Sequence, residues 1–182
     1  MTLSPRLDSI QALYRKLDRE SVRAFHHSNL THKSDHFYNF CITAHSLRDH
    51  LLEHLGKIHP TDRQPFNDAW QQDPNLVAVA DIANTAKHFR LRTRSGQLKI
   101  PKTREVRRAA TSVYDFFVGS DGSSLIKKRT GVPTIAVTLE DGRRLEMYRF
   151  MYTVLEYWRE TLLLHGVKVR RQSWSSLHGR AT

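Results

Sequence analysis

The chain has 182 residues, of which 39% are hydrophobic and 26% charged, a globular composition that excludes a wholly disordered protein. A chain of this length buries roughly 70% of its unfolded surface on folding, so it can form a core without metals or disulfides. The single cysteine, Cys41, excludes an intrachain disulfide and indicates a reducing compartment, so we expect a cytoplasmic protein. No apolar run approaches the roughly 20 residues of a membrane span, and the N-terminal segment lacks the apolar stretch of a signal peptide.

The net charge of +11 is unevenly distributed. Residues 1–86 carry nine basic and ten acidic side chains, a net charge of −1, whereas residues 87–182 carry twenty and eight, a net charge of +12. Arginine outnumbers lysine 20 to 9, and its planar guanidinium suits bidentate contact with phosphate. The pattern predicts a polyanion partner, nucleic acid first, while a role in solubility alone stays open. The predicted nucleic-acid-binding residues are Arg90, Arg92, Arg94, Lys99, Lys102, Arg104, Arg107 and Arg108.

The first predicted helix runs from a cap at Ser4-Pro5 to about His27, and a polar connector follows over 29–34. The second is predicted over 35–55 with Gly56 at its end, because apolar residues recur there at helical spacing. A short helix reaching about Gln72 and a longer one over 74–89 come next.

The apolar period changes after this fourth helix. Alternation over 89–92 and the turn residues Ser95-Gly96 predict the start of a hairpin. A strand is predicted over 113–118, with a helix over 103–114 as the alternative, and loops over 119–124 and 131–133. The clearest strand pair, 134–139 with 144–147, flanks Asp141-Gly142. The last helix is predicted over 146–165, ending at Gly166.

These elements predict a mainly α protein of the α+β class. We expect a helical bundle with a small antiparallel β insert, at about 90–147, before the C-terminal helix. The expected domain covers residues 1–166, and residues 167–182 form a basic, flexible tail.

Eleven histidines raise the question of a metal site. The run His50-Leu51-Leu52-Glu53-His54 lacks glutamate at the second position of the H-E-x-x-H motif. With one cysteine and no acidic third ligand at a characteristic spacing, we expect no metal and no cofactor.

A polar set interrupts the otherwise apolar fourth helix. Asp81, Asn84 and His88 share one face of it. Buried polar groups must be paired, so this face either forms a structural network or opens into a functional cleft. If the second and fourth helices pack antiparallel, Arg48 is placed to neutralise Asp81 and orient His88. Both interpretations stay open.

The run Asp81-Ile-Ala-Asn-Thr-Ala-Lys-His88, after Phe37-Tyr-Asn-Phe and Leu47-Arg-Asp, resembles the HEPN superfamily of small helical domains over about residues 35–90. Its members include metal-independent RNases, commonly dimeric, with an R-x(4–6)-H motif that often reads R-N-x-x-x-H. Here Ala83 occupies the arginine position, and Arg48…His54 supplies another match.

The resemblance implies the catalytic candidates Arg48, His54, Asn84 and His88. A histidine would act as base on a ribose 2′-OH and an arginine would steady the phosphate. We therefore expect a HEPN-like protein that binds RNA or another polyanion, as a possible homodimer, with enzymatic activity left open. The alternative is a non-enzymatic accessory protein that binds DNA or a protein.

Overall fold

The computed structural model describes residues 7–57, 59–87, 100–118 and 121–170. The expected cap at Ser4-Pro5 and the expected hairpin start over 89–96 lie outside these ranges. Residues 7–9 are described and are not helical, so the first helix starts later than the predicted cap at Ser4-Pro5 implies. The elements in chain order are α1 (Ile10–His26), α2 (Leu30–His54), α3 (Pro60–Gln72), α4 (Pro74–Lys87), β1 (Glu105–Val118), β2 (Ser124–Thr138), β3 (Arg144–Glu146) and α5 (Met147–Leu164). The α+β class is thereby confirmed.

Capping side chains explain where the first two helices begin. The Ser9 hydroxyl accepts the Ala12 N–H at the start of α1, and the Asn29 side chain accepts the N–H groups of Thr31 and His32. Because Asn29 satisfies these free donors, α2 begins at Leu30, five residues earlier than predicted. The predicted connector over 29–34 was therefore wrong.

The predicted ends of α2 and α5 are confirmed. After α5, Gly166 and Val167 donate backbone N–H groups to Leu163 and Leu162 at 3.0 and 2.8 Å, which satisfies carbonyls of the last turn. Val167 is itself buried. The core thus extends past residue 166, where we expected the tail to begin, and residues 171–182 lie outside the described part.

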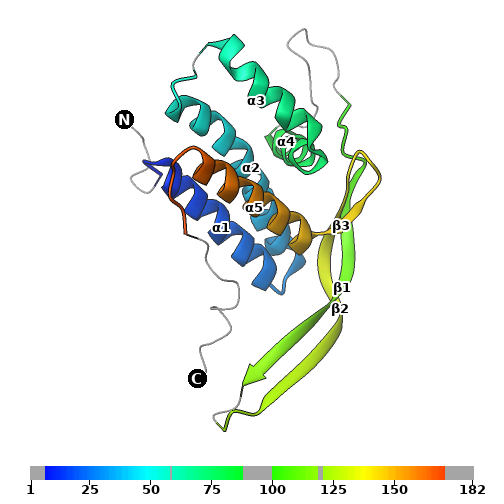
Figure 1. The fold of residues 1–182 in the computed structure, drawn as a ribbon. Helices are drawn as coiled ribbons and strands as arrows, with labels where there is room; N and C mark the ends of the chain where they lie inside the picture. The colour runs from blue at the N-terminus through cyan, green and yellow to red at the C-terminus, as the bar shows by residue number, and fades with distance from the viewer. Residues whose placement is uncertain (1–6, 58, 88–99, 119–120, 171–182) are drawn as a thin grey trace.

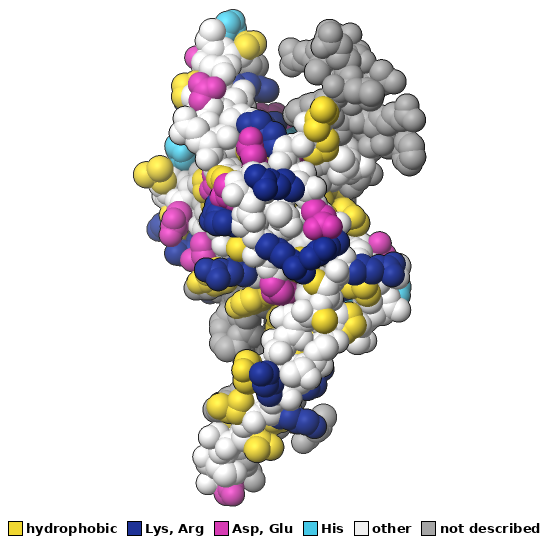
Figure 2. Space-filling view, turned by 90° about the vertical axis from the view of Figure 1, so that its right-hand side faces the viewer, with side chains coloured by type: hydrophobic (Ala, Val, Ile, Leu, Met, Phe, Trp, Pro, Cys, Tyr) yellow, Lys and Arg dark blue, Asp and Glu magenta, His cyan; other side chains and the backbone are white. Residues whose placement is uncertain are grey.

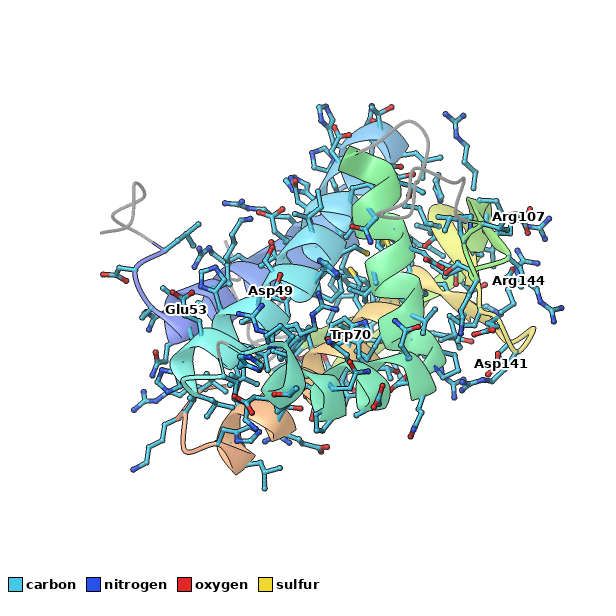
Figure 3. The ribbon with its side chains drawn as sticks, turned by 90° about the horizontal axis from the view of Figure 1, so that it is seen from above. Asp49, Glu53, Trp70, Arg107, Asp141 and Arg144 are labelled. Carbon is cyan, nitrogen blue, oxygen red and sulfur yellow. The ribbon has the colours of Figure 1, made fainter. Side chains whose placement is uncertain are left out.

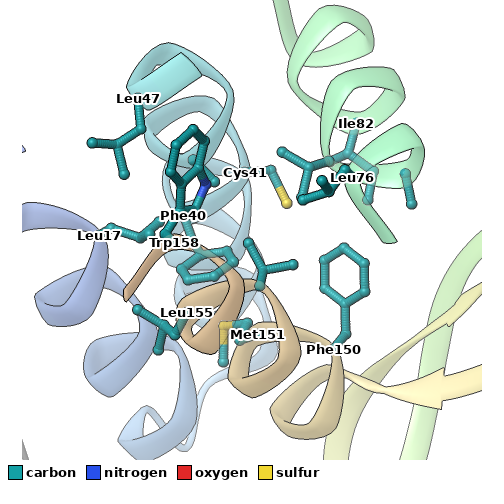
Figure 4. Packing of buried hydrophobic residues seen from close by; sticks show 14 of the residues in the cluster. Leu17, Phe40, Cys41, Leu47, Leu76, Ile82, Phe150, Met151, Leu155 and Trp158 are labelled. Atoms are coloured by element: carbon teal, nitrogen blue, oxygen red, sulfur yellow. The ribbon is translucent and has the colours of Figure 1, made fainter. Parts of the chain in front are cut away.

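The helices surround one apolar core, with α2 in contact with α1, α4 and α5 (Figure 1). Phe40 of α2 and Trp158 of α5 are fully buried, as the apolar periodicity predicts. Figure 4 shows how α2, α4 and α5 contribute to this core. The strands add a further apolar layer through Ile135, Val137 and Leu139.

The described strands form an antiparallel sheet in the order β1-β2-β3. The predicted hairpin about Asp141-Gly142 is confirmed as the β2–β3 connection. The helix alternative over 103–114 was wrong, because these residues pair along β1 with β2 from Glu105↔Thr138 to Val118↔Ser124. The predicted loop over 131–133 was also wrong. It lies inside β2, beside a bulge at which two residues, 130 and 131, oppose Ser112 alone.

Beyond this bulge the β1–β2 pair leaves the helical body and projects into solvent (Figure 1). We call this part, residues 113–118 and 121–131, the arm. All described side chains from 121 to 131 are exposed. β1 and β2 have 14 and 15 residues, so both strands are longer than the predicted strands over 113–118 and 134–139.

Candidate nucleic-acid interface

Arg48 and His54 leave α2 in different directions. Six residues of an α-helix turn through about 600°, which places the two side chains about 120° apart around the axis. The Arg48 guanidinium donates to Asp49 Oδ1 and lies 5.4 Å from the centre of the Trp70 ring. His54 is exposed in the last turn. The structure therefore does not bring this arginine and histidine together.

Asp81 is buried and binds the segment that leads into β1. Its Oδ2 accepts both the backbone N–H and the hydroxyl of Thr103 at 2.9 Å, two residues before β1 begins. Among the described residues it forms no ion pair with Arg48, contrary to our expectation. Asn84 is half-buried one turn further along α4, and His88 lies outside the described ranges. The contacts seen at Asp81 are structural.

The sheet separates apolar and basic side chains between its two faces. Val106, Val137 and Leu145 are cross-strand partners on the face that packs against the helical core. Strand alternation places Arg107 and Arg144 on the opposite, outer face. Both side chains point away from the body in Figure 3, on the far side of the molecule from Asp49 and Glu53.

Figure 2 views the molecule from the sheet side and shows Lys and Arg side chains gathered over its middle, with acidic side chains among them. We call the exposed residues of the segments 102–108 and 140–144, which leave out the half-buried Thr103 and Val106, the basic surface. It carries six basic and three acidic side chains, a net charge of +3; the basic ones are Lys102, Arg104, Arg107, Arg108, Arg143 and Arg144.

Half of these cations face carboxylates. Ion pairs join Lys102 to Glu140 at 3.5 Å, Arg107 to Glu105 at 3.4 Å and Arg143 to Asp141 at 2.6 Å. The Arg143 backbone N–H and guanidinium lower the pKa of Asp141. Exposed pairs of this kind are weak, so phosphate can compete for the same guanidinium groups. Arg104 instead donates to the Glu140 carbonyl oxygen.

The predicted binding residues divide between described and undescribed parts of the chain. Lys102, Arg104, Arg107 and Arg108 lie on the basic surface, whereas Arg90, Arg92, Arg94 and Lys99 fall outside the described ranges. The sequence analysis missed Arg143 and Arg144, which belong to the hairpin turn and the short β3. Both arginines directly follow the predicted Asp141-Gly142 turn. This position in the sequence would have indicated that they lie near β1, once the order of the strands in the sheet was known.

Lys33 is a buried charge that the sequence analysis did not identify, because it falls in the predicted connector. Its Nζ donates to the carbonyl oxygens of Ala24 and Phe25 at 3.0 and 2.9 Å, at the C-terminal end of α1. Burial lowers the pKa of Lys33, and the nearby Glu146 carboxylate opposes this effect. A cation at this position stabilises the negative end of the helix dipole.

Histidines gather at the α1–α2 turn without forming a metal centre. His36 Nδ1 lies 2.8 Å from Glu20, and the rings of His27 and His32 are 4.7 Å apart. In the described part of the chain, no group of three His, Cys, Asp or Glu side chains is placed to hold a metal ion. Within the same residues, every helix is too short or too polar to cross a bilayer.

Comparison of the chain with protein-family models, with curated proteins and with solved structures finds no match.

Proposed function

We propose that this HEPN-like protein binds nucleic acid, with RNA favoured, through the outer face of its sheet. One observation carries the proposal: Arg107 and Arg144 are both exposed on that face, within the two segments whose net charge is +3. Arg108 is part of this count and is exposed from the opposite side of β1. The sequence adds further arginines just before it, at 90, 92 and 94. RNA is favoured over DNA because of the resemblance of residues 35–90 to a superfamily that contains RNases.

The test is the salt dependence of binding to a labelled single-stranded RNA, measured by fluorescence anisotropy over about 50 to 300 mM KCl. Each phosphate contact contributes roughly 0.7 to the slope of log affinity against log salt. The variant Arg107→Ala/Arg144→Ala should therefore lower the slope by about 1.4 and weaken binding to all RNA sequences alike.

The matched control is Arg15→Ala/Arg19→Ala, which removes the same charge from exposed positions on α1. It should leave the slope nearly unchanged, because exposed charges more than a Debye length of about 10 Å apart are largely screened at 0.1 M salt. Equal losses in both variants would mean that net charge alone attracts RNA. Absence of binding at low salt would refute the function.

The proposed function is binding without RNA cleavage. Ala83 occupies the arginine position of the motif, and Arg48 and His54 diverge on α2. We expect the purified protein to leave a labelled RNA intact in the presence of EDTA. Metal-independent cleavage that is lost in His88→Ala, at unchanged melting temperature, would contradict this expectation.

The second candidate function is that of a non-enzymatic interaction protein, and the arm favours it. Large apolar side chains on an exposed ribbon are typical of surfaces that contact other proteins. The two functions are compatible, because the basic surface and the arm occupy different parts of the sheet.

A further inference from the structure

We propose that the arm packs against a second copy of this chain in a reciprocal, two-fold exchange. The inference goes beyond the proposed function, since it concerns an apolar surface distinct from the basic one. It rests on the apolar residues that the arm exposes, on the small charge of the arm, and on a receiving cavity at its base.

Among its described residues, the arm exposes five large apolar side chains, which are distributed over both of its faces. They are Tyr114, Phe117, Val118, Leu125 and Ile126, each 51–65% exposed. Phe117 and Leu125 are cross-strand partners on one face, while Tyr114 and Ile126 lie on the other. A two-stranded ribbon is marginally stable alone in water. Among the described elements, no helix or further strand packs against either face of the distal part of this ribbon.

The charge of the arm does not suit a phosphate backbone. Lys127, Lys128 and Arg129 are offset by Asp115 and Asp121, which leaves a net charge of +1. Arg129 forms a two-point ion pair with Asp115. Asp121 lies at the tip, where the backbone N–H and the hydroxyl of Ser123 donate hydrogen bonds to its Oδ1, and its negative charge repels phosphate. A nearly neutral apolar ribbon fits a protein surface better than a nucleic acid.

The interface area favours a second copy over a single docked arm. Five half-exposed side chains of this size present on the order of 500 Å² of apolar surface. Two exchanged arms bury twice that area, and with the surfaces that receive them the total reaches about 2,000 Å², as in stable protein interfaces. One arm alone reaches about half of that.

The chain also carries a receiving surface. A cavity of about 540 Å³ opens where the base of the arm faces the end of α1. Phe25, Val132 and Pro133 supply apolar parts of its lining, and polar or charged residues such as His27, Lys33 and Arg129 supply the rest. In a two-fold dimer the same surface is used on both subunits, so each arm reaches toward the cavity of its partner. This cavity is large enough to hold two or three apolar side chains.

The experiment is sedimentation velocity of the full chain over a concentration series. We expect the wild-type protein to sediment as a dimer of twice 21.2 kDa, and Phe117→Gln/Leu125→Gln as a monomer. Each substitution occurs twice in the dimer, so the dissociation constant should rise at least about 100-fold. The matched control, Ile100→Gln/Leu164→Gln, replaces residues that are 85% and 81% exposed elsewhere, and it should remain dimeric.

Far-UV circular dichroism and the melting temperature of the monomeric fold check that the arm variant is folded, since both replaced side chains are exposed. The proposal is overturned if the wild type sediments as a monomer up to about 100 µM, or if the arm variant dimerises like the control. A monomeric wild type whose arm variant loses RNA affinity would assign the arm to nucleic acid instead. Failure of the proposed function is distinct, because it appears in the salt slope of Arg107→Ala/Arg144→Ala.

Discussion

Replacing Asp81 tests whether this residue is a structural anchor. Its carboxylate accepts two hydrogen bonds from Thr103, both 2.9 Å, while the residue is 5% exposed. Hydrogen bonds to a charged group contribute roughly 1.5–3 kcal/mol each. Thr103 is only half-buried, so water can replace part of the loss. We therefore expect Asp81→Ala to lower the free energy of unfolding by about 2–4 kcal/mol.

For a chain of this size, that loss corresponds to a fall of about 4–16 °C in the melting temperature. Asp81→Asn retains an acceptor oxygen, so it should cost only about 1 kcal/mol. A double-mutant cycle with Thr103→Val isolates the pairwise contribution, which urea unfolding measures as a coupling of about 1 kcal/mol or more. An unchanged melting temperature in Asp81→Ala, or a coupling near zero, would refute the role of Asp81 as the anchor of β1.

Three further predictions concern other buried or conformationally restricted groups. Burial holds the pKa of Lys33 below its value in the unfolded state, so the unfolded state binds this proton more readily. The free energy of unfolding should therefore rise with pH between the two pKa values. Lys33→Met should lose this rise, as urea unfolding at alkaline pH would show. Burial raises the pKa of the Cys41 thiol, so iodoacetamide at pH 8 should label Cys41 only after denaturation, as mass spectrometry would show. Gly131 is one of the two bulge residues, its φ is +70°, and no atom lies within 4 Å of an added Cβ. Gly131→Ala should therefore destabilise β2 by about 1–2 kcal/mol through backbone strain alone. Amide hydrogen exchange should accelerate along β2 and stay unchanged in α2.

The sequence predicts well those features of the fold that depend on residues close together in the chain. Helical periodicity identified α2 and α5, including the burial of Phe40 and Trp158. Turn chemistry located the β2–β3 hairpin. Charge counting located the basic half of the chain, part of which forms the basic surface. Two helix starts were misplaced. The helix α1 begins after Ser9 instead of Ser4, and α2 begins after Asn29, five residues before its predicted start. Ser and Asn cap helices, but the same residues also occur in polar loops, so the sequence pattern did not identify which of them would cap.

Features that depend on contacts between residues distant in sequence were determined only by the tertiary structure. The segment over 103–114 has no decisive period of its own, and it becomes a strand because β2 supplies its hydrogen-bonding partners. The sequence analysis paired Asp81 with Arg48. In the structure its carboxylate instead accepts hydrogen bonds from Thr103, which is also distant in sequence. Arg107 and Arg144 lie 37 residues apart in sequence, and strand order alone places them on one face. Cross-strand pairing is a long-range property, so local patterns identify the elements of this protein but not which of their side chains meet.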